Sequence, residues 1–264
     1  MTIKAPEVQE ITSDDELKRS EELLGEGETK LAIEALINAS TLLVNPNTEQ
    51  QDASAAKKAL WLSTNTLNQL ASLDELTIEQ HYQLTVIKAQ ALLSLNRLEL
   101  SHQTLLSAQE ISEEHSFPLS FSYYQALPKI LDNKNRPVQA LEAALFAFAL
   151  NTQLDNEESN VEINSLWQHF TALMPWQITL LENTTAPFAE GWLALIADAN
   201  RFGANSSKFQ STMAQWQSNF PTHPGNLIVQ ELLSAPLQLN EIKHVAVLLP
   251  LSGSQYQAGL AAQQ

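Results

Sequence analysis

Small and apolar residues recur at helical spacing along this chain, and that spacing restricts the fold more than any other feature. Residues 32–43 carry them at i, i+3, i+4, i+7 and i+11, which places them on one face of a helix. They are Ala32, Ala35, Leu36, Ala39 and Leu43. Small side chains on such a face allow a second helix to approach closely. The stretch therefore predicts one helix of a hairpin, whose partner runs from Ser13 to about Leu24.

A small, large, small triplet with the spacing i, i+4, i+7 then recurs twice, 69 residues after the first triplet and 39 residues after the second. The three triplets are Ala32, Leu36 and Ala39, then Ser101, Leu105 and Ala108, then Ala140, Ala144 and Ala147. We interpret the longer separation as close to two periods of a helix-turn-helix repeat of roughly 34 residues. The sequence therefore predicts an all-α fold of tetratricopeptide-like stacked helical hairpins, an α-solenoid, over residues 1–240.

Capping and turn residues predict where the helices begin and end. The hydroxyl of Ser13 and the carboxylate of Glu16 have the spacing of a helix start, and Gly25 and Gly27 that of a helix end and turn. Asn96 and Arg97 form a second turn, and Pro137 suits the first turn of a helix. We expect further helices at about 53–73, 78–95, 162–173, 175–181, 188–200 and 207–219. Between them we expect breaks at Pro118, at Pro128 and in an acidic loop at 155–160.

The last 24 residues have a different character. Residues 242–250, Ile-Lys-His-Val-Ala-Val-Leu-Leu-Pro, form a short and nearly continuous apolar run, as in a strand buried on both faces of a parallel sheet. One strand, one turn and part of a helix cannot make a domain. We therefore expect residues 241–264 to be the truncated start of a second, α/β domain, and the natural chain to continue.

Charge and composition exclude several classes of function. The formal net charge of −16 disfavours nucleic acid and anionic lipid, because binding phosphates needs clustered cations. We interpret the charge as a solubility feature, with steering toward a basic partner as the alternative. The absence of cysteine excludes disulfides and thiolate chemistry. No stretch is apolar enough to span a bilayer, and no signal peptide follows Met1. If the protein is exported, its targeting segment is expected to be missing from this sequence.

No motif in the chain amounts to an active site, so we predict no catalytic, metal or cofactor-binding residues and no enzyme activity. Ser54 and Lys57 match Ser-x-x-Lys, but the other elements of that acyl-enzyme site are missing. The histidines at 81, 102, 115, 169, 223 and 244 lack metal-ligand spacing; only Glu241 and His244 form Glu-x-x-His. We interpret carboxylate pairs such as Glu113 and Glu114 as residues on solvent-exposed helix faces. The tryptophans at 61, 167, 176, 192 and 216 are predicted to be core or inter-helix packing.

Three segments in a fixed order carry a family resemblance. They are residues 191–195 (Gly-Trp-Leu-Ala-Leu), 216–224 (Trp-Gln-Ser-Asn-Phe-Pro-Thr-His-Pro) and 245–253 (Val-Ala-Val-Leu-Leu-Pro-Leu-Ser-Gly). With the helical region before them, they resemble the LpoA family of penicillin-binding protein activators. The third segment looks like the first strand of that family's periplasmic-binding-protein-like domain. The family's anchoring cysteine has no counterpart here.

The resemblance implies a non-enzymatic regulator of peptidoglycan synthesis. Such a protein is an outer-membrane lipoprotein on the periplasmic side, which binds and activates a class A penicillin-binding protein. It would touch the membrane only through a lipid anchor outside this sequence. The alternative is a receptor for a small solute, built on the domain that begins near residue 241. A cell-wall hydrolase has no supporting residues.

Overall fold

The computed structural model describes residues 11–45, 53–70, 76–151, 156–201 and 207–234, and these residues form helices joined by turns. The helices are α1 (Ser13–Gly25), α2 (Thr29–Val44), α3 (Ala53–Leu70), α4 (Ile78–Ser94), α5 (Leu98–His115), α6 (Phe121–Asn133), α7 (Pro137–Leu150), α8 (Asn156–Ala172), α9 (Pro175–Leu181), α10 (Ala189–Arg201), α11 (Ser207–Asn219) and α12 (Asn226–Ser234). The all-helical prediction is confirmed for this part of the chain. The strand predicted at 242–250 lies outside the described residues.

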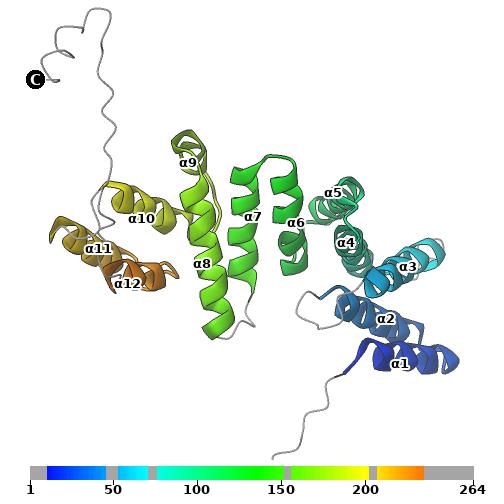
Figure 1. The fold of residues 1–264 in the computed structure, drawn as a ribbon. Coiled ribbons are helices and arrows are strands. Elements are labelled where there is room, and N and C mark those ends of the chain that lie inside the picture. Colours follow the sequence, from blue (N-terminus) through cyan, green and yellow to red (C-terminus); the bar gives the residue numbers. More distant parts are fainter. Residues whose placement is uncertain (1–10, 46–52, 71–75, 152–155, 202–206, 235–264) are drawn as a thin grey trace, which may run out of the picture.

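The helices follow one another in space as they do in sequence. Figure 1 shows an elongated, curved array that runs from α1 at one end to α11 and α12 at the other. Its buried core is divided in the same way into successive clusters, the largest of which lies among α7 to α12. Because each cluster joins neighbouring helices, no single centre holds the molecule together, and its long sides stay open to solvent.

Three helix pairs, α1/α2, α4/α5 and α6/α7, turn in the same way. The turn residue has a left-handed backbone in each: φ is 83° at Gly27, 57° at Asn96 and 55° at Asn135. Glycine and asparagine tolerate this region best. The amide of the following residue then donates back to a carbonyl five positions earlier, at 2.9, 2.8 and 2.9 Å, in the bonds Glu28 to Leu23, Arg97 to Leu92 and Arg136 to Leu131. The expected turns at Gly27 and Asn96 are therefore present.

The spacing of these turns agrees with the predicted helix-turn-helix repeat in one interval and not in the other. Asn96 and Asn135 are separated by two helices, α5 and α6, as one hairpin repeat requires. Between Gly27 and Asn96 the described residues hold three helices, α2, α3 and α4, where two repeats would place four. The 69-residue separation is thus not two regular repeats, since a single long helix, α3, stands where a pair was expected.

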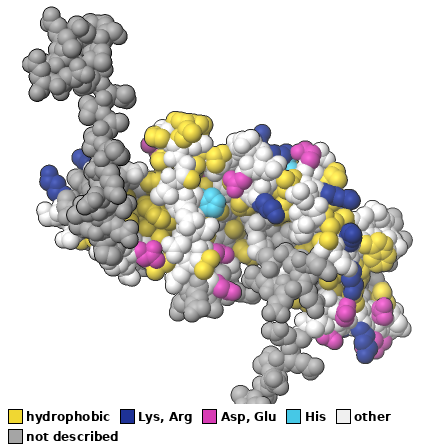
Figure 2. All heavy atoms as spheres, in the orientation of Figure 1, with side chains coloured by type: hydrophobic (Ala, Val, Ile, Leu, Met, Phe, Trp, Pro, Cys, Tyr) yellow, Lys and Arg dark blue, Asp and Glu magenta, His cyan; other side chains and the backbone are white. Residues whose placement is uncertain are grey.

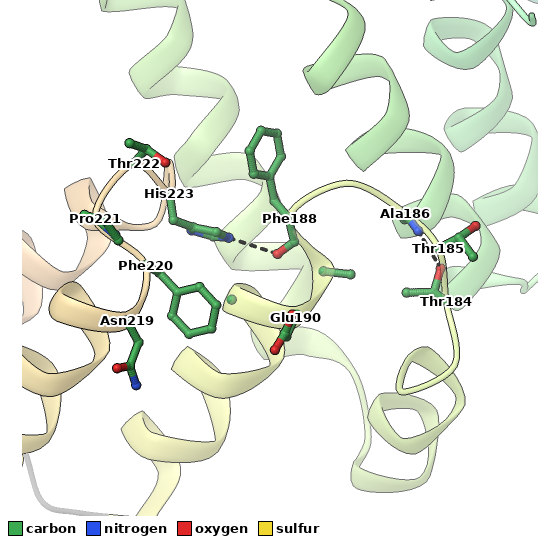
Figure 3. A pocket seen from close by; sticks show the side chains of 12 residues that line it. Thr184, Thr185, Ala186, Phe188, Glu190, Asn219, Phe220, Pro221, Thr222 and His223 are labelled. Carbon is green, nitrogen blue, oxygen red and sulfur yellow. Dashed lines mark hydrogen bonds between the residues drawn. The ribbon is translucent and has the colours of Figure 1, made fainter.

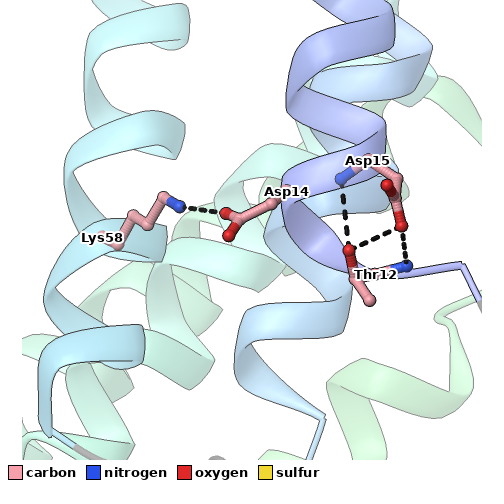
Figure 4. A network of polar contacts seen from close by, with 4 residues as sticks. All are labelled: Thr12, Asp14, Asp15 and Lys58. Atoms are coloured by element: carbon pink, nitrogen blue, oxygen red, sulfur yellow. Dashed lines mark hydrogen bonds and ion pairs between the residues drawn. The ribbon is translucent and has the colours of Figure 1, made fainter.

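The first helix begins at Ser13, as predicted, but its N-cap is one residue earlier than expected. Thr12, and not Ser13, is the N-cap: its hydroxyl accepts from the amide of Asp15 at 3.2 Å, and the Asp15 carboxylate accepts from the amide of Thr12 at 2.9 Å (Figure 4). These bonds lower the pKa of the Asp15 carboxyl. Glu16, the expected capping partner, is buried instead. Asp14 pairs with Lys58 of α3 at 2.8 Å, and this exposed ion pair connects α1 with the third helix.

Three other boundaries differ from the sequence prediction. Helix α6 continues through Pro128, where a break was expected. The predicted acidic loop at 155–160 is largely the first turn of α8, where acidic residues favour the positive end of the helix dipole. Helix α12 was not predicted, because its start follows closely on Pro221 and Pro224. Asn226 supports that start, since its side-chain amide donates to the carbonyls of Phe220, Pro221 and His223.

Candidate functional site

The residues weighed as catalytic candidates lie on exposed helix surfaces where the structure describes them. Ser54 and Lys57 are both exposed on α3. Among the described residues no three metal-ligating side chains form a group that could hold a metal ion. Glu241 and His244 lie outside the described residues. Glu113 and Glu114 are exposed on α5, as expected for a solvated helix face.

The tryptophan prediction is right for three residues and wrong for two. Trp192 and Trp216 are fully buried, and Trp167 is half-buried against Trp192 with ring centroids 6.2 Å apart. Trp61 and Trp176, by contrast, are 63% and 61% exposed. Helical spacing cannot tell these cases apart, because it assigns a residue to a face and does not say whether another element covers that face.

His223 is the centre of a buried aromatic junction between α10 and α11. Its imidazole is buried, and the rings of Trp192, Trp216, Phe188 and Phe220 surround it, with centroids 5.1, 5.2, 5.6 and 6.0 Å away. Its two ring nitrogens bond to backbone groups on different elements. The two segments 191–195 and 216–224, singled out in the sequence, thus meet here.

The hydrogen bonds of His223 define its tautomer. The amide of Gly225 donates to Nδ1 at 2.9 Å, so the ring proton is on Nε2, which donates to the carbonyl of Phe188 at 2.9 Å. Burial lowers the pKa of the imidazole, and the bond to Phe188 opposes that shift in part. With both nitrogens engaged, His223 is a neutral structural residue and not a free acid, base or metal ligand.

Two glycines make room for this histidine. A Cβ atom at residue 191 would lie 2.5 Å from Cδ2 of His223, and one at residue 225 would lie 2.9 Å from Nδ1. The carbonyl of Gly191 also accepts a hydrogen bond from Nε1 of Trp216 at 2.9 Å, which joins α10 to α11. The Gly-Trp and Trp-to-Pro segments are therefore one packing unit. Sequence reasoning identified both segments but not their contact.

A cavity of about 450 Å³ opens beside this junction, between residues 184–191 and residues 219–223 (Figure 3). His223 forms part of its wall, and the side chains of Glu190, Asn219 and Thr222 lie around it. A second hollow of about 470 Å³ lies between α2 and the start of α4 and is lined by polar side chains such as Glu34, Asn38 and Gln83. Volumes of roughly 300–1,000 Å³ are typical of small-ligand sites.

Helix α9 presents an exposed apolar patch, made of Met174 at its N-cap and Trp176 and Leu180 on its surface. Their exposed fractions are 60%, 61% and 58%. Trp176 and Leu180 are four residues apart and so share a face, while Leu181 of the same helix is buried. Figure 2 shows the apolar surface over α9 at the edge of the array. Exposed tryptophan and methionine are enriched where proteins bind other proteins.

None of the described helices has the length and continuous apolarity needed to cross a bilayer. The fold and these surfaces together define an elongated helical scaffold with a buried aromatic junction around His223, a cavity beside it and an exposed apolar patch on α9. By its sequence, the chain belongs to the LppC family: the family model described as "LppC putative lipoprotein" matches residues 45–264.

Relatives and solved structures agree with this assignment. The chain is 24% identical over 202 residues to the penicillin-binding protein activator LpoA of Pasteurella multocida, covering 75% of this chain and 33% of the relative. It is 29% identical over 118 residues to LpoA of Vibrio antiquarius, covering 44% and 20%. It thus spans a third or less of the length of these curated relatives. The resemblance predicted from the three segments is confirmed.

The fold resembles that of crystal structures at low sequence identity. The amino-terminal domain of E. coli LpoA matches with a TM-score of 0.58 and 19% identity, covering 90% of this chain and 94% of that domain. Full-length LpoA of Haemophilus influenzae matches with a TM-score of 0.53 and 18% identity, covering 96% of this chain and 44% of that protein. At this identity the likeness concerns the fold alone.

Proposed function

We propose that this chain is the helical part of a non-enzymatic regulator of peptidoglycan synthesis, which binds a class A penicillin-binding protein and activates it. The observation that carries the proposal is the family match over residues 45–264, together with relatives named as penicillin-binding protein activators. The likeness of the fold to the amino-terminal domain of E. coli LpoA supports it.

The proposal includes two domains. Residues 1–240 form a tetratricopeptide-like helical domain, and residues 241–264 begin a periplasmic-binding-protein-like α/β domain. The three helix pairs with equal turns support the first part. The second part, and with it the alternative of a small-solute receptor, rests on the apolar run at 242–250, which lies outside the described residues.

The proposal also includes a location on the periplasmic face of the outer membrane, with a lipid anchor as the attachment. The family's description as lipoproteins supports this. An anchor of that kind would leave the elongated helical array free to extend from the membrane toward an enzyme. The excess of acidic residues would suit a basic surface on that enzyme.

Activation in this proposal is a binding effect. An effector raises the activity of an enzyme to the extent that it binds the active conformation more tightly than the inactive one. A rigid scaffold suits the task because it presents side chains without first having to order them. Among the described residues, the α9 patch of Met174, Trp176 and Leu180 is the surface that we assign to the enzyme, because its apolar side chains are already exposed.

Two measurements on the purified chain test the proposal. The immobilised chain should retain a class A penicillin-binding protein and not a monofunctional transpeptidase, which is the matched control. Added in solution, it should raise the rate at which that enzyme polymerises glycan strands. If the chain retains no class A enzyme and leaves the polymerisation rate unchanged, the function does not belong to this part of the protein.

A further inference from the structure

Lysine and arginine are absent from one long stretch of this acidic chain. Residues 137–200 contain neither residue type, although they contain eight carboxylates, so all 14 cations of the chain lie at 1–136 and 201–264. On the face shown in Figure 2, the surface over α8 and α9 likewise carries acidic side chains and no basic ones. The negative charge of this region is therefore not balanced within the region itself, and it attracts cationic groups.

Three of these carboxylates are placed where they oppose the stability of their own helices. Glu182 is the C-cap residue of α9, at the negative end of the helix dipole, and α9 has no basic residue in its last turn. Glu158 and Glu162 are four residues apart on α8, and like charges at that spacing repel each other. Burial, and then Glu158, raise the pKa of the Glu162 carboxyl. Charges that cost stability within the chain are available to stabilise a complex with a cationic partner.

The α9 patch of Met174, Trp176 and Leu180 lies within this cation-free stretch. Helix α9 packs on α7 and α10 and is anchored by the buried Leu181, so the patch is presented from a fixed helix. Glu182 is exposed two residues after Leu180. The seven residues of α9 rise about 10 Å, a length that a short segment of a partner can cover. Apolar side chains beside an uncompensated carboxylate match a partner that offers both apolar and basic groups.

We propose that the α9 patch, with Glu182 at its edge, is a docking site for a basic amphipathic segment of a partner protein. Apolar side chains of that segment pack on Trp176 and Leu180, and its lysine or arginine side chains lie toward Glu182. An arginine can also stack on the exposed indole of Trp176. The proposal deepens the function given above and rests on it only for the identity of the partner, which is then the class A penicillin-binding protein.

Other occupants fit this surface less well. Anionic lipid would be repelled, because residues 137–200 supply no cation to bind its headgroups. A second copy of this chain would bring the same carboxylates against each other. A wholly apolar segment would cover Trp176 but would desolvate Glu182 without giving it a partner. A basic amphipathic segment satisfies both the apolar and the charged groups.

The test is a titration of the 15N-labelled chain with model peptides, followed by NMR. A leucine–lysine amphipathic peptide of about four helical turns should shift the signals of residues 174–182 saturably, and added salt should weaken it. A leucine–glutamate peptide of equal length and hexalysine should each bind there at least about fivefold more weakly, because each lacks one of the two features. Helix α5, which exposes Glu113 and Glu114, should not shift saturably. The proposal is overturned if the leucine–lysine peptide leaves residues 174–182 unshifted, if either other peptide binds there as tightly, or if α5 responds equally.

Two variants and a control separate charge from apolar surface. Glu182→Lys reverses one charge and suits the end of the helix dipole, so it should weaken the leucine–lysine peptide at least about fivefold without lowering the melting temperature. Trp176→Ala should weaken it at least as much. Glu110→Lys, exposed on α5, is the matched charge control and should leave the affinity unchanged. Folded Glu182→Lys and Trp176→Ala chains that bind the peptide as the original does would contradict the proposal.

Capture of the class A enzyme distinguishes this proposal from the proposed function. Glu182→Lys should weaken that capture, and Glu110→Lys should not. If the original and Glu182→Lys chains capture the enzyme equally well, the docking proposal fails and the proposed function stands. If no enzyme is captured while the leucine–lysine peptide binds at residues 174–182, the proposed function fails and the docking site stands.

Discussion

The hydroxyl of Ser101 on α5 donates a 2.7 Å hydrogen bond to the carbonyl of Ala89 on α4, at a point where both residues are fully buried. The same crossing occurs 69 positions earlier with the two roles exchanged, since Ser20 on α1 donates to the carbonyl of Ala32 on α2 at 3.0 Å. A small hydroxyl residue faces alanine in both hairpins. The close approach of the two helices therefore requires small side chains at this crossing. The serine that donates the hydrogen bond can lie on either helix of the pair.

Replacing this hydroxyl tests its contribution. Ser101→Ala should lower the free energy of unfolding by about 1 kcal/mol, because it removes one buried hydrogen bond and leaves the helix packing intact. Ser107→Ala on the exposed face of α5 is the control and should change it by less than about 0.5 kcal/mol. Urea titration followed by circular dichroism measures both. Equal values for the two variants would mean that the bond contributes nothing.

The left-handed backbone of Asn96 predicts opposite effects on stability for two substitutions at this position. Asn96→Ala should destabilise the chain by roughly 1 kcal/mol, because alanine tolerates a φ of 57° poorly. Asn96→Gly should be neutral or slightly stabilising. Thermal denaturation of the pair distinguishes backbone strain from loss of the asparagine side chain, since loss of the side chain alone would affect both variants equally.

The contact between Gly191 and His223 predicts a large effect from one added methyl group. Gly191→Ala should destabilise the chain by about 1–3 kcal/mol, because the new Cβ would overlap an imidazole that is bonded on both sides. The matched control is Gly25→Ala at the end of α1, where a Cβ meets nothing within 4 Å. That variant should be as stable as the original or slightly more so. Chemical denaturation of both gives the comparison, and a tolerated Gly191→Ala would show that the junction is loose.

The neutral, buried state of His223 predicts a dependence of stability on pH. Burial lowers its pKa in the folded chain below the value of about 6.5 expected when unfolded, so below that pH the unfolded chain binds more protons. Stability is fully present above pH 6.5 and should fall as the pH decreases toward the folded pKa. His102, whose pKa burial also lowers, acts in the same direction. The raised pKa of Glu162 acts oppositely at lower pH.

Melting temperatures between pH 7.5 and 5.5 measure this effect. His223→Gln should melt lower at every pH but with a flatter dependence, because the titrating group is gone. Ser101→Ala is the control for destabilisation alone and should keep the original slope. An unchanged slope in His223→Gln would show that other groups cause the pH dependence.

The exposed patch on α9 predicts an effect on binding without one on stability. Trp176→Ala should weaken capture of the class A penicillin-binding protein about tenfold, because an exposed tryptophan at an interface carries much of the binding energy. Trp61→Ala on α3, equally exposed, is the control and should bind as the original does. Surface plasmon resonance gives the affinities. If the two variants bind alike, the patch is not the contact.

Most helices of this chain could be predicted from sequence because helix formation depends on neighbours a few residues apart. The predicted helices at 175–181 and 207–219 match α9 and α11. The errors lie at ends and interruptions. Pro128 lies inside α6, since the surrounding helix tolerates one missing amide donor. Asn226 supports the start of α12 through hydrogen bonds to three carbonyls, which no local sequence pattern predicts.

The junction around His223 could be predicted only in part. The sequence singled out residues 191–195 and 216–224 as the segments that identify the family. It assigned His223 no role, because a histidine in a proline-rich turn has no preferred partner within its own segment. Its partner is the carbonyl of Phe188, 35 residues earlier, and the fit also requires Gly191 to lack a side chain.

An acidic, cysteine-free chain of amphipathic helices could be predicted directly from the amino-acid sequence, because composition and helical period are properties of short stretches. Three other features follow from the packing of helices against one another: Trp192 is buried while Trp176 is exposed, Ser101 bonds to Ala89, and a cavity opens beside His223. Those outcomes depend on which helix covers which face. Contacts between residues far apart in the sequence decide which face is covered. The spacing of apolar positions along one helix carries no information about those contacts.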